Sequence, residues 1–141
     1  AQRLVRRLCP LCVKRRDMTE EELELLTVDF QSSLASDDPL RDPAVLHQHW
    51  RDTYGTAGQL HTAHAPGCEK CGRTGYRGRL GIHELLVVTH QLRHLIQVRA
   101  RSDDVLQQAL SDGMRTLRQD GIEKVLLGQT NLAEVRANSN S

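Results

Sequence analysis

The chain has 141 residues, of which 38% are hydrophobic and 26% are charged, and its 19 basic residues nearly balance its 18 acidic ones. This length allows one modest domain or two small ones and is short for a complete multi-substrate enzyme. A net charge of +1 and an aromatic content of 3% argue against a nucleic-acid partner. No apolar run approaches the roughly 20 residues of a membrane-spanning helix, so we expect no transmembrane segment.

The first third of the chain contains one ambiguous segment and one predicted helix. Residues 1–8 fit either a strand or a helical turn, because periodicity does not decide over so short a run. Farther along, Thr19 and Glu22 have the spacing of a capping box, which predicts the start of a short amphipathic helix. The apolar side of this helix would carry Leu23, Leu26 and Phe30.

A second helix is predicted to begin at Pro43, with Asp42 as its N-cap. Its apolar stripe would consist of Leu46, Trp50 and Tyr54. Turn-forming residues are frequent in the segments 32–42 and 55–67, and we expect both segments to be loops.

The segment 78–88 (GRLGIHELLVV) has the Ile, Leu and Val content of a strand, and the pattern after it is purely helical. Thr89 is the expected cap of the first of these helices, and Ser102 opens the second. A third helix is predicted to begin near Thr116 and to end at Gly128, and a last short helix follows it.

All four cysteines occur in two C-x-x-C pairs, Cys9 with Cys12 and Cys68 with Cys71. A two-residue spacer lets both thiolates of one turn reach the same ion at about 2.3 Å, so two such pairs predict a tetrahedral four-thiolate Zn²⁺ site. Structural disulfides are one alternative, but the sequence gives no secretory context. A redox C-x-x-C motif is another, and it does not explain two pairs. With four protein ligands the zinc site would be closed, and therefore structural rather than catalytic.

Basic residues gather beside both cysteine pairs, among them Arg77 and Arg79. Four thiolates around one Zn²⁺ leave a formal charge of −2, which neighbouring cations can offset. The seven histidines form no H-E-x-x-H motif, so we expect them mostly at the surface. We identify no catalytic residue in the sequence.

Three motifs in combination carry a family resemblance. They are the paired cysteines, the T-G-Y-x-G-R-x-G-I pattern at residues 74–82, and the G-M-x-T-L pattern at residues 113–117. With these motifs, nearly the whole chain resembles the C-terminal portion of the type II secretion and type IV pilus assembly ATPases, the GspE/PilB-like family of motor proteins. The sequence also begins without methionine, so we expect it to be a part of a longer parent protein.

The resemblance implies a parent with a homo-hexameric, RecA-like core that hydrolyses ATP with Mg²⁺. The parent would be cytoplasmic, peripheral to the inner membrane, and would contact the platform proteins of a secretion or pilus machine. This chain contains no G-x-x-x-x-G-K-[ST] phosphate loop, so we expect the fragment alone to hydrolyse no ATP. Arg77 and Arg79 are the candidates for a contact with the core or with the next subunit.

The predicted fold is α+β and mostly helical. It consists of a short antiparallel β-ribbon with a tetracysteine zinc-binding insert, followed by a C-terminal helical bundle at the edge of the RecA-like core. Related pilus-retraction ATPases lack the insert, which implies that residues 1–8 form a core edge strand paired antiparallel with a returning strand at residues 79–88. The insert would then span residues 9–78, and the helical subdomain residues 89–141.

We expect two separate hydrophobic cores. One would lie near the metal and include Leu23, Leu26, Phe30, Leu46 and Trp50. The other would belong to the helical subdomain and include Leu92, Leu95, Ile96, Val105, Leu106, Leu110, Leu117, Val125 and Leu126.

An alternative function is a free-standing zinc module. Such a module would dock on nucleic acid or on another protein through its basic rim. A salt-dependent affinity for DNA would favour this alternative, and its absence favours the motor protein.

Overall fold

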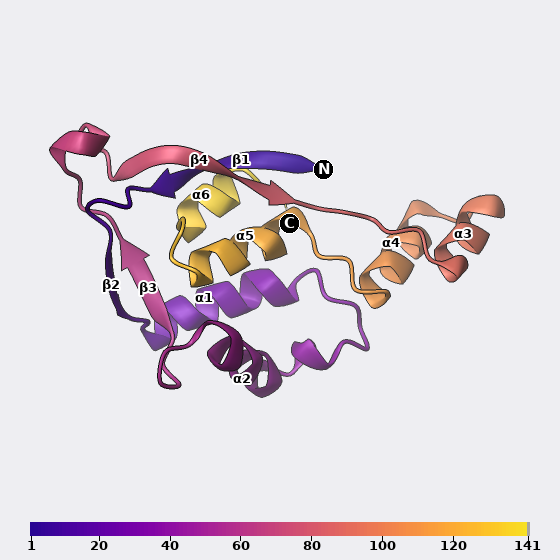
Figure 1. Ribbon diagram of the computed structural model, residues 1–141. Helices are drawn as coiled ribbons and strands as arrows, with labels where there is room; N and C mark the ends of the chain where they lie inside the picture. Colours follow the sequence, from indigo (N-terminus) through magenta and orange to yellow (C-terminus); the bar gives the residue numbers. More distant parts are fainter. Residues whose placement is uncertain (141) are drawn as a thin grey trace.

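The computed structural model describes residues 1–140, which form two small antiparallel sheets and a set of helices (Figure 1). Strand β1 (Gln2–Leu8) pairs with β4 (Tyr76–His83), and strand β2 (Lys14–Asp17) pairs with β3 (His61–His64). In the chain order, β2 and β3 both lie between β1 and β4. The fold is α+β and mostly helical, as predicted.

The predicted pairing of residues 1–8 with the returning strand is confirmed, but the strand boundaries differ. β4 begins at Tyr76, before the predicted residue 79, and ends at His83. Beyond β4, the Ala1 amine donates to the Glu84 carbonyl at 2.7 Å, and the Glu84 amide donates to the Ala1 carbonyl at 2.9 Å. No strand of the described chain lies opposite residues 85–88, so these β-forming residues stay unpaired.

The expectation that residues 55–67 form only a loop is wrong, because β3 lies within them. Lys14 pairs with His64 and Asp17 with His61. Every residue of β2 is exposed and none is apolar. The alternation of buried and exposed side chains that marks a strand in a sequence is therefore missing here.

The helices between the cysteine pairs begin where the sequence predicts. Helix α1 (Glu20–Gln31) has a complete capping box built on Thr19. Helix α2 (Pro43–Tyr54) follows Asp42, whose carboxylate accepts a hydrogen bond from the first turn. Short 3₁₀ helices at Pro39–Arg41 and Glu69–Cys71 were not predicted.

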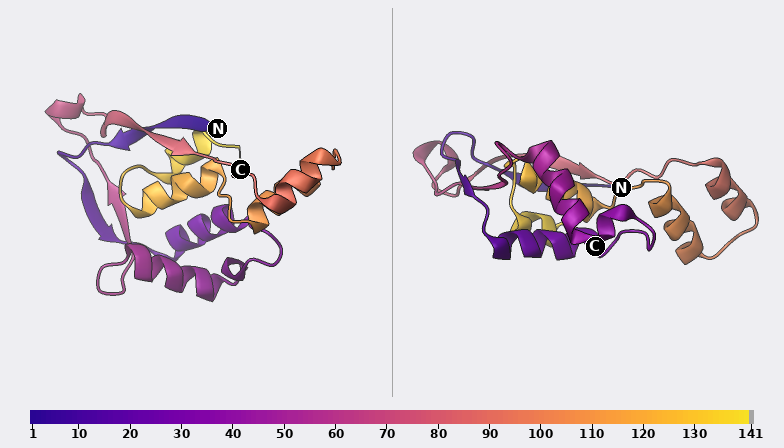
Figure 2. Two further views of the ribbon diagram at one scale, coloured as in Figure 1. Left: turned by 45° about the vertical axis from the view of Figure 1, so that its right-hand side comes forward. Right: turned by 90° about the horizontal axis from the view of Figure 1, so that it is seen from below.

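The helices that follow β4 in the described part of the chain are α3 (His90–Gln97), α4 (Ser102–Ser111), α5 (Leu117–Leu126) and α6 (Leu132–Ala137). Thr89, Thr116 and Asn131 cap α3, α5 and α6 through side-chain oxygens. Helices α3 and α4 form a hairpin that projects away from the rest of the molecule (Figure 2). No helix among residues 1–140 has both the length and the hydropathy that crossing a bilayer requires.

The prediction of two separate cores is wrong. One cluster of buried side chains joins the insert helices α1 and α2 to α5 and α6. Its members are Leu26, Phe30, Leu34, Leu46, Trp50, Leu60, Ile122, Val125, Leu126 and Val135. Ile96 and Leu106 remain about half exposed, because the α3–α4 hairpin stands apart from this cluster. Helical periodicity correctly indicates which sides of α1 and α5 are buried, but it does not indicate that they bury each other.

Helices α5 and α6 approach each other closely at Gly121. A Cβ atom at this position would lie 2.5 Å from Cγ1 and 2.9 Å from Cγ2 of Val135, whose side chain is fully buried. Distances this short are not tolerated between carbon atoms, so glycine is the residue that lets α6 add Val135 to the core.

Replacing Gly121 by Ala should destabilise the chain by about 1–3 kcal/mol through overpacking, although Ala is intrinsically the better helix former by about 1 kcal/mol. The measurement is the free energy of unfolding in urea. The double variant Gly121→Ala/Val135→Ala recovers space for the new methyl group, and its loss should be smaller than the sum of the two single losses. Additive losses, or a Gly121→Ala variant that is more stable than the parent chain, would contradict the close approach.

Candidate metal centre

The two cysteine pairs meet where the β1–β4 pair ends and the chain turns toward β2 and β3. Cys9 and Cys12 lie in the turn that follows β1, and Cys68 and Cys71 lie in the 3₁₀ turn that precedes β4. All four sulfur atoms are within 4.8 Å of one another. Among residues 1–140, these four side chains form the group of potential metal ligands that the fold brings together.

The sulfur separations fit a tetrahedral metal ion. The Sγ atom of Cys68 lies 3.9 Å from that of Cys9 and 3.7 Å from that of Cys71. A tetrahedron with metal–sulfur bonds of about 2.3 Å has sulfur–sulfur edges of about 3.8 Å. A disulfide needs a separation of about 2.05 Å, far below these values. The arrangement can therefore hold a metal ion, as the paired spacing predicts.

Backbone hydrogen bonds shape both turns around the sulfurs. The Cys9 amide donates to the Gly75 carbonyl at 2.8 Å, which joins the two turns across the ribbon. The Val13 amide donates back to the Cys9 carbonyl at 3.0 Å, and the Arg73 amide donates to the Cys68 carbonyl at 2.8 Å. Each turn is thus closed by the main chain, so the positions of the sulfurs follow from the backbone.

Gly75 is required at its position. Its φ angle is +83°, and a Cβ atom there would lie 2.4 Å from the carbonyl oxygen of Ala65. The turn that carries the second cysteine pair thereby packs directly on the chain returning from β3. A side chain at Gly75 would push these two segments apart beside the sulfurs.

The four thiols sit in unequal environments. Burial opposes ionisation of the Cys71 thiol, but the amides of Cys68 and Gly75 donate to its sulfur at 3.2 and 3.3 Å and help lower its pKa to about 6. Burial raises the pKa of the Cys12 thiol to about 12. Ionisation is therefore favoured at Cys71 and opposed at Cys12, and metal binding requires both as thiolates.

The two arginines singled out in the sequence lie on β4 with exposed side chains. Arg79 stands opposite Arg6 in the strand pairing. The backbone carbonyl of Arg77 accepts a hydrogen bond from the Arg7 side chain at 3.1 Å. A role of Arg77 and Arg79 in an interface stays a prediction.

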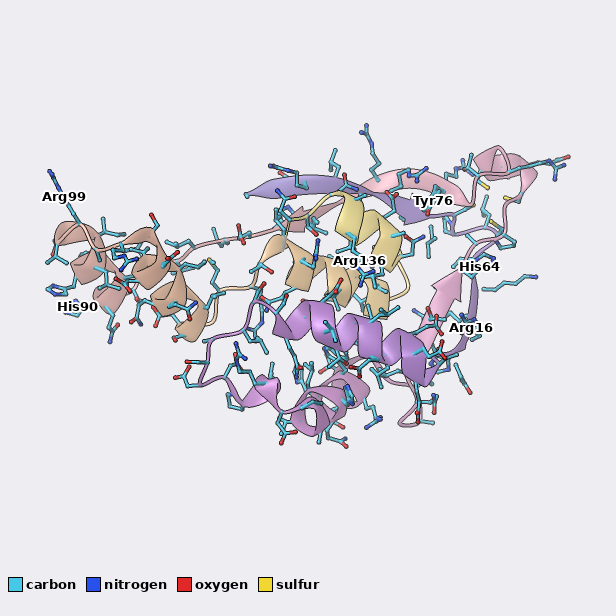
Figure 3. The ribbon with its side chains drawn as sticks, turned by 180° about the vertical axis from the view of Figure 1, so that it is seen from behind. Arg16, His64, Tyr76, His90, Arg99 and Arg136 are labelled. Carbon is cyan, nitrogen blue, oxygen red and sulfur yellow. The ribbon has the colours of Figure 1, made fainter. Side chains whose placement is uncertain are left out.

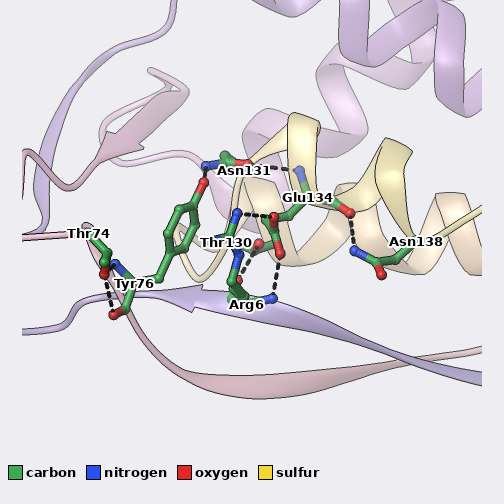
Figure 4. Close-up of polar contacts among 7 residues, drawn as sticks. All are labelled: Arg6, Thr74, Tyr76, Thr130, Asn131, Glu134 and Asn138. Atoms are coloured by element: carbon green, nitrogen blue, oxygen red, sulfur yellow. Dashed lines mark hydrogen bonds and ion pairs between the residues drawn. The ribbon is translucent and has the colours of Figure 1, made fainter. Parts of the chain in front are cut away.

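A group of polar contacts beside the cysteines was missed by sequence reasoning (Figure 4). The Arg6 guanidinium pairs with the Glu134 carboxylate at 2.9 Å, and the Asn131 side-chain amide donates to the Tyr76 hydroxyl at 2.7 Å. The paired residues are 128 and 55 positions apart in the chain. No local pattern signals such contacts, because each residue alone reads as an ordinary surface or capping residue.

A groove of about 990 Å³ lies next to the metal centre. Its lining comes from β2, β3, α1 and the chain around α6. Figure 3 shows its lining residues Arg16, His64 and Tyr76 at one end of the molecule. Arg15 on its rim donates to the Leu127 carbonyl at 2.6 Å, which attaches β2 to the end of α5. The groove thus follows the junction between the insert and the C-terminal helices.

Four sulfurs that could hold a metal ion converge at the end of the β1–β4 ribbon, and the comparison with known proteins identifies the family of the chain. Residues 1–137 match the family described as type II/IV secretion system protein, and the chain belongs to that family. This confirms the resemblance found in the sequence.

Individual relatives agree with the family assignment. The chain is 39% identical over 135 residues to a type II secretion system protein E of Aeromonas hydrophila, and 34% identical over 135 residues to a type II secretion system ATPase E of Vibrio cholerae. Each match covers 96% of this chain and 22% of the relative. A type IV pilus assembly ATPase PilB of Thermus thermophilus is 51% identical over 71 residues, which are 50% of this chain and 8% of that protein. The chain thus spans about a fifth of the length of the type II secretion relatives.

The ion pair between Arg16 and Glu22 attaches β2 to the start of α1, with contacts of 2.7 and 2.9 Å. Arg16 lowers the pKa of Glu22 from 4.5 to about 2. Because the folded-state pKa is depressed, the stabilisation is present above about pH 4.5 and is lost as the pH falls toward 2.

Replacing Glu22 by Gln, which keeps the capping box, should lower the free energy of unfolding at pH 7 by about 0.5–1 kcal/mol. The difference between variant and parent chain should shrink as the pH falls toward 2, where half of the folded chains have a protonated Glu22. Glu21→Gln, in the same first turn, is the control for the helix-dipole contribution. An equal effect of both substitutions at pH 7, or an unchanged difference at pH 2, would contradict the role of the ion pair.

Proposed function

We propose that this chain is the metal-bearing, C-terminal structural and coupling part of an ATPase that powers type II protein secretion or type IV pilus assembly. Membership of the family and the names of the relatives support the general role. The convergence of the four cysteine sulfurs is the observation that carries the structural part of the proposal. The chain is the scaffold through which a motion of the motor reaches its partners.

The proposed ion is one structural Zn²⁺ per chain, held by Cys9, Cys12, Cys68 and Cys71. Four thiolates are the ligand set of structural zinc sites, and they leave no position for water or substrate. When bound, the ion supplies cross-linking rather than chemistry. The residues themselves set the geometry, since the Cys9–Gly75 hydrogen bond and the turn amides orient the sulfurs.

ATP hydrolysis belongs, in this proposal, to other parts of the parent protein. Phosphoryl transfer needs a cradle of backbone amides, a lysine at the phosphates and a held Mg²⁺. Residues 1–141 contain no phosphate-loop motif. ATP and Mg²⁺ would bind elsewhere in a cytoplasmic homo-hexamer, peripheral to the inner membrane, that contacts the platform proteins of the machine.

We keep residues 8, 78 and 88 as the proposed boundaries between the segments of the chain. Residues 9–78 form the metal-bearing insert, and residues 89–141 the C-terminal helical subdomain. The shared core supports a close connection between them, since α5 packs on α1. The insert would therefore move together with α5 and α6.

Protein purified without added zinc should contain about one Zn²⁺ per chain, and Cys68→Ser should lose at least about half of it, because three thiolates no longer close the site. Elemental analysis of the purified protein provides the measurement. The control is Lys70→Ser, which changes an exposed residue in the spacer of the same C-x-x-C turn and should keep full occupancy. Equal zinc content in both variants would remove the cysteines from the site.

Replacing both Arg77 and Arg79 by Ala in the full-length parent should lower ATP hydrolysis or secretion by roughly two- to thirtyfold, as expected for the loss of about 0.5–2 kcal/mol of coupling. Zinc content and hexamer assembly should stay normal. The matched control replaces the exposed Arg93 and Arg101 on the α3–α4 hairpin. Unchanged hydrolysis and secretion in the Arg77/Arg79 variant would exclude the two residues from the coupling contact.

A further inference from the structure

The outer edge of β1, opposite its contact with β4, is covered by the chain that leads into α6. The Leu8 amide donates to the Gln129 carbonyl at 2.9 Å, and the Thr130 hydroxyl donates to the Arg6 carbonyl at 2.9 Å. The Glu134 carboxylate accepts from the Arg6 amide at 2.8 Å as well as from its guanidinium. The backbone of β1 is therefore also hydrogen-bonded on its outer side at Arg6 and Leu8, and α6 is held against this end of the strand.

Asn131 and Tyr76 connect this docked segment to β4 (Figure 4). The Asn131 side chain caps α6 by accepting from the Glu134 amide at 3.0 Å, and its amide group donates to the Tyr76 hydroxyl at 2.7 Å. The Arg6 guanidinium lies 4.0 Å from the centre of the Tyr76 ring. Tyr76 thus contacts both Asn131 at the start of α6 and Arg6, which binds the Glu134 carboxylate of α6.

Tyr76 is also adjacent to the metal centre. Its amide donates to the Thr74 hydroxyl at 3.1 Å, and that hydroxyl donates to the Cys71 carbonyl at 2.8 Å. The neighbouring residue, Gly75, donates its amide to the Cys71 sulfur and accepts from the Cys9 amide. The position of Tyr76 is therefore set by the same turn that positions the sulfurs.

The strand register contributes to this placement. Arg6 stands opposite Arg79, but Leu8 stands opposite Tyr76, so β4 contains one residue more than β1 between these pairs. Such a bulge shifts the alternation of side chains by one position. In a regular ladder Arg77 would stand opposite Leu8. The bulge places Tyr76 there instead, next to the segment that leads into α6.

We propose that Tyr76 and Asn131 form a latch through which occupancy of the four-sulfur centre controls the docking of α6 on β1; the input of this latch rests on the proposed zinc site. A bound ion fixes the turn from Cys68 to Gly75 and so fixes Tyr76. Loss of the ion releases the turn, the hydrogen bond to Asn131 and the start of α6. A helix of six residues is not stable alone, so its protection depends on docking.

The test is hydrogen–deuterium exchange of the full-length protein at residues 131–137, with and without a chelator, while metal content is measured in parallel. In the parent protein, removal of zinc should speed exchange in α6. Tyr76→Phe keeps the ring but loses the hydroxyl, so with zinc bound it should already exchange roughly three- to tenfold faster there, the range that one hydrogen bond accounts for. Chelation should then add little further.

Two further variants sharpen the test. Asn131→Ser keeps a good N-cap but loses the donor to Tyr76, and it should reproduce the effect of Tyr76→Phe at full zinc content. The control Tyr54→Phe removes the hydroxyl of the other tyrosine, for which no hydrogen bond is found within residues 1–140, and should leave exchange in α6 unchanged.

The outcomes separate the latch from the metal site. If zinc is removed and hydrogen exchange in α6 stays unchanged, the latch is overturned but the metal site is not. The same holds if Tyr76→Phe exchanges in α6 at the same rate as Tyr54→Phe. If the parent protein is purified without zinc, the proposed metal site is overturned, and with it the claim that metal binding controls the docking of α6.

Discussion

The convergence of the four cysteine sulfurs is the constraint on which the rest of the architecture depends. It fixes the point at which the chain leaves the β1–β4 pair after Cys9 and the point at which it returns at Cys68. The segment between these points carries β2, β3, α1 and α2, so the direction of the whole insert follows from two short turns. If the proposed Zn²⁺ is bound, its binding free energy contributes directly to folding and stabilises the chain at these two turns.

The insert does not complete its own core. Phe30 and Trp50, packed edge to face with ring centres 5.5 Å apart, are covered by side chains of α5 and α6. The fully buried Gln119 of α5 donates to the Phe30 carbonyl at 3.0 Å, and Arg136 of α6 binds the Asp29 carboxylate with contacts of 2.7 and 3.0 Å. Buried polar groups of this kind are costly when unpaired, so they favour one arrangement of the insert on the C-terminal helices.

The features that the sequence predicts correctly depend on neighbouring residues. Thr19, Thr89 and Thr116 cap helices because a cap acts within one turn, and the meeting of the four cysteine sulfurs can be predicted because each C-x-x-C pair is one turn. The resemblance to a family added the pairing of β1 with β4, which the short strands alone leave undecided. The β2–β3 pair and the shared core arise from contacts between distant segments that carry no local pattern, so periodicity does not reveal them.

These contacts divide the molecule into parts of different stiffness. The ribbon, the insert, α5 and α6 are joined by the sulfur centre, by the shared core and by the hydrogen bonds of Thr130 and Glu134 to Arg6 on β1. The α3–α4 hairpin is attached through residues 84–89 and 112–116, and the Thr89 hydroxyl donates to the Asp112 carboxylate at 2.6 Å across its base. Elements that pack tightly on one another move as a unit, whereas a hairpin joined to the rest only by two linking segments can rotate about them. A motion applied to the ribbon would therefore reach the insert nearly undiminished, whereas the hairpin could turn separately on its two connections.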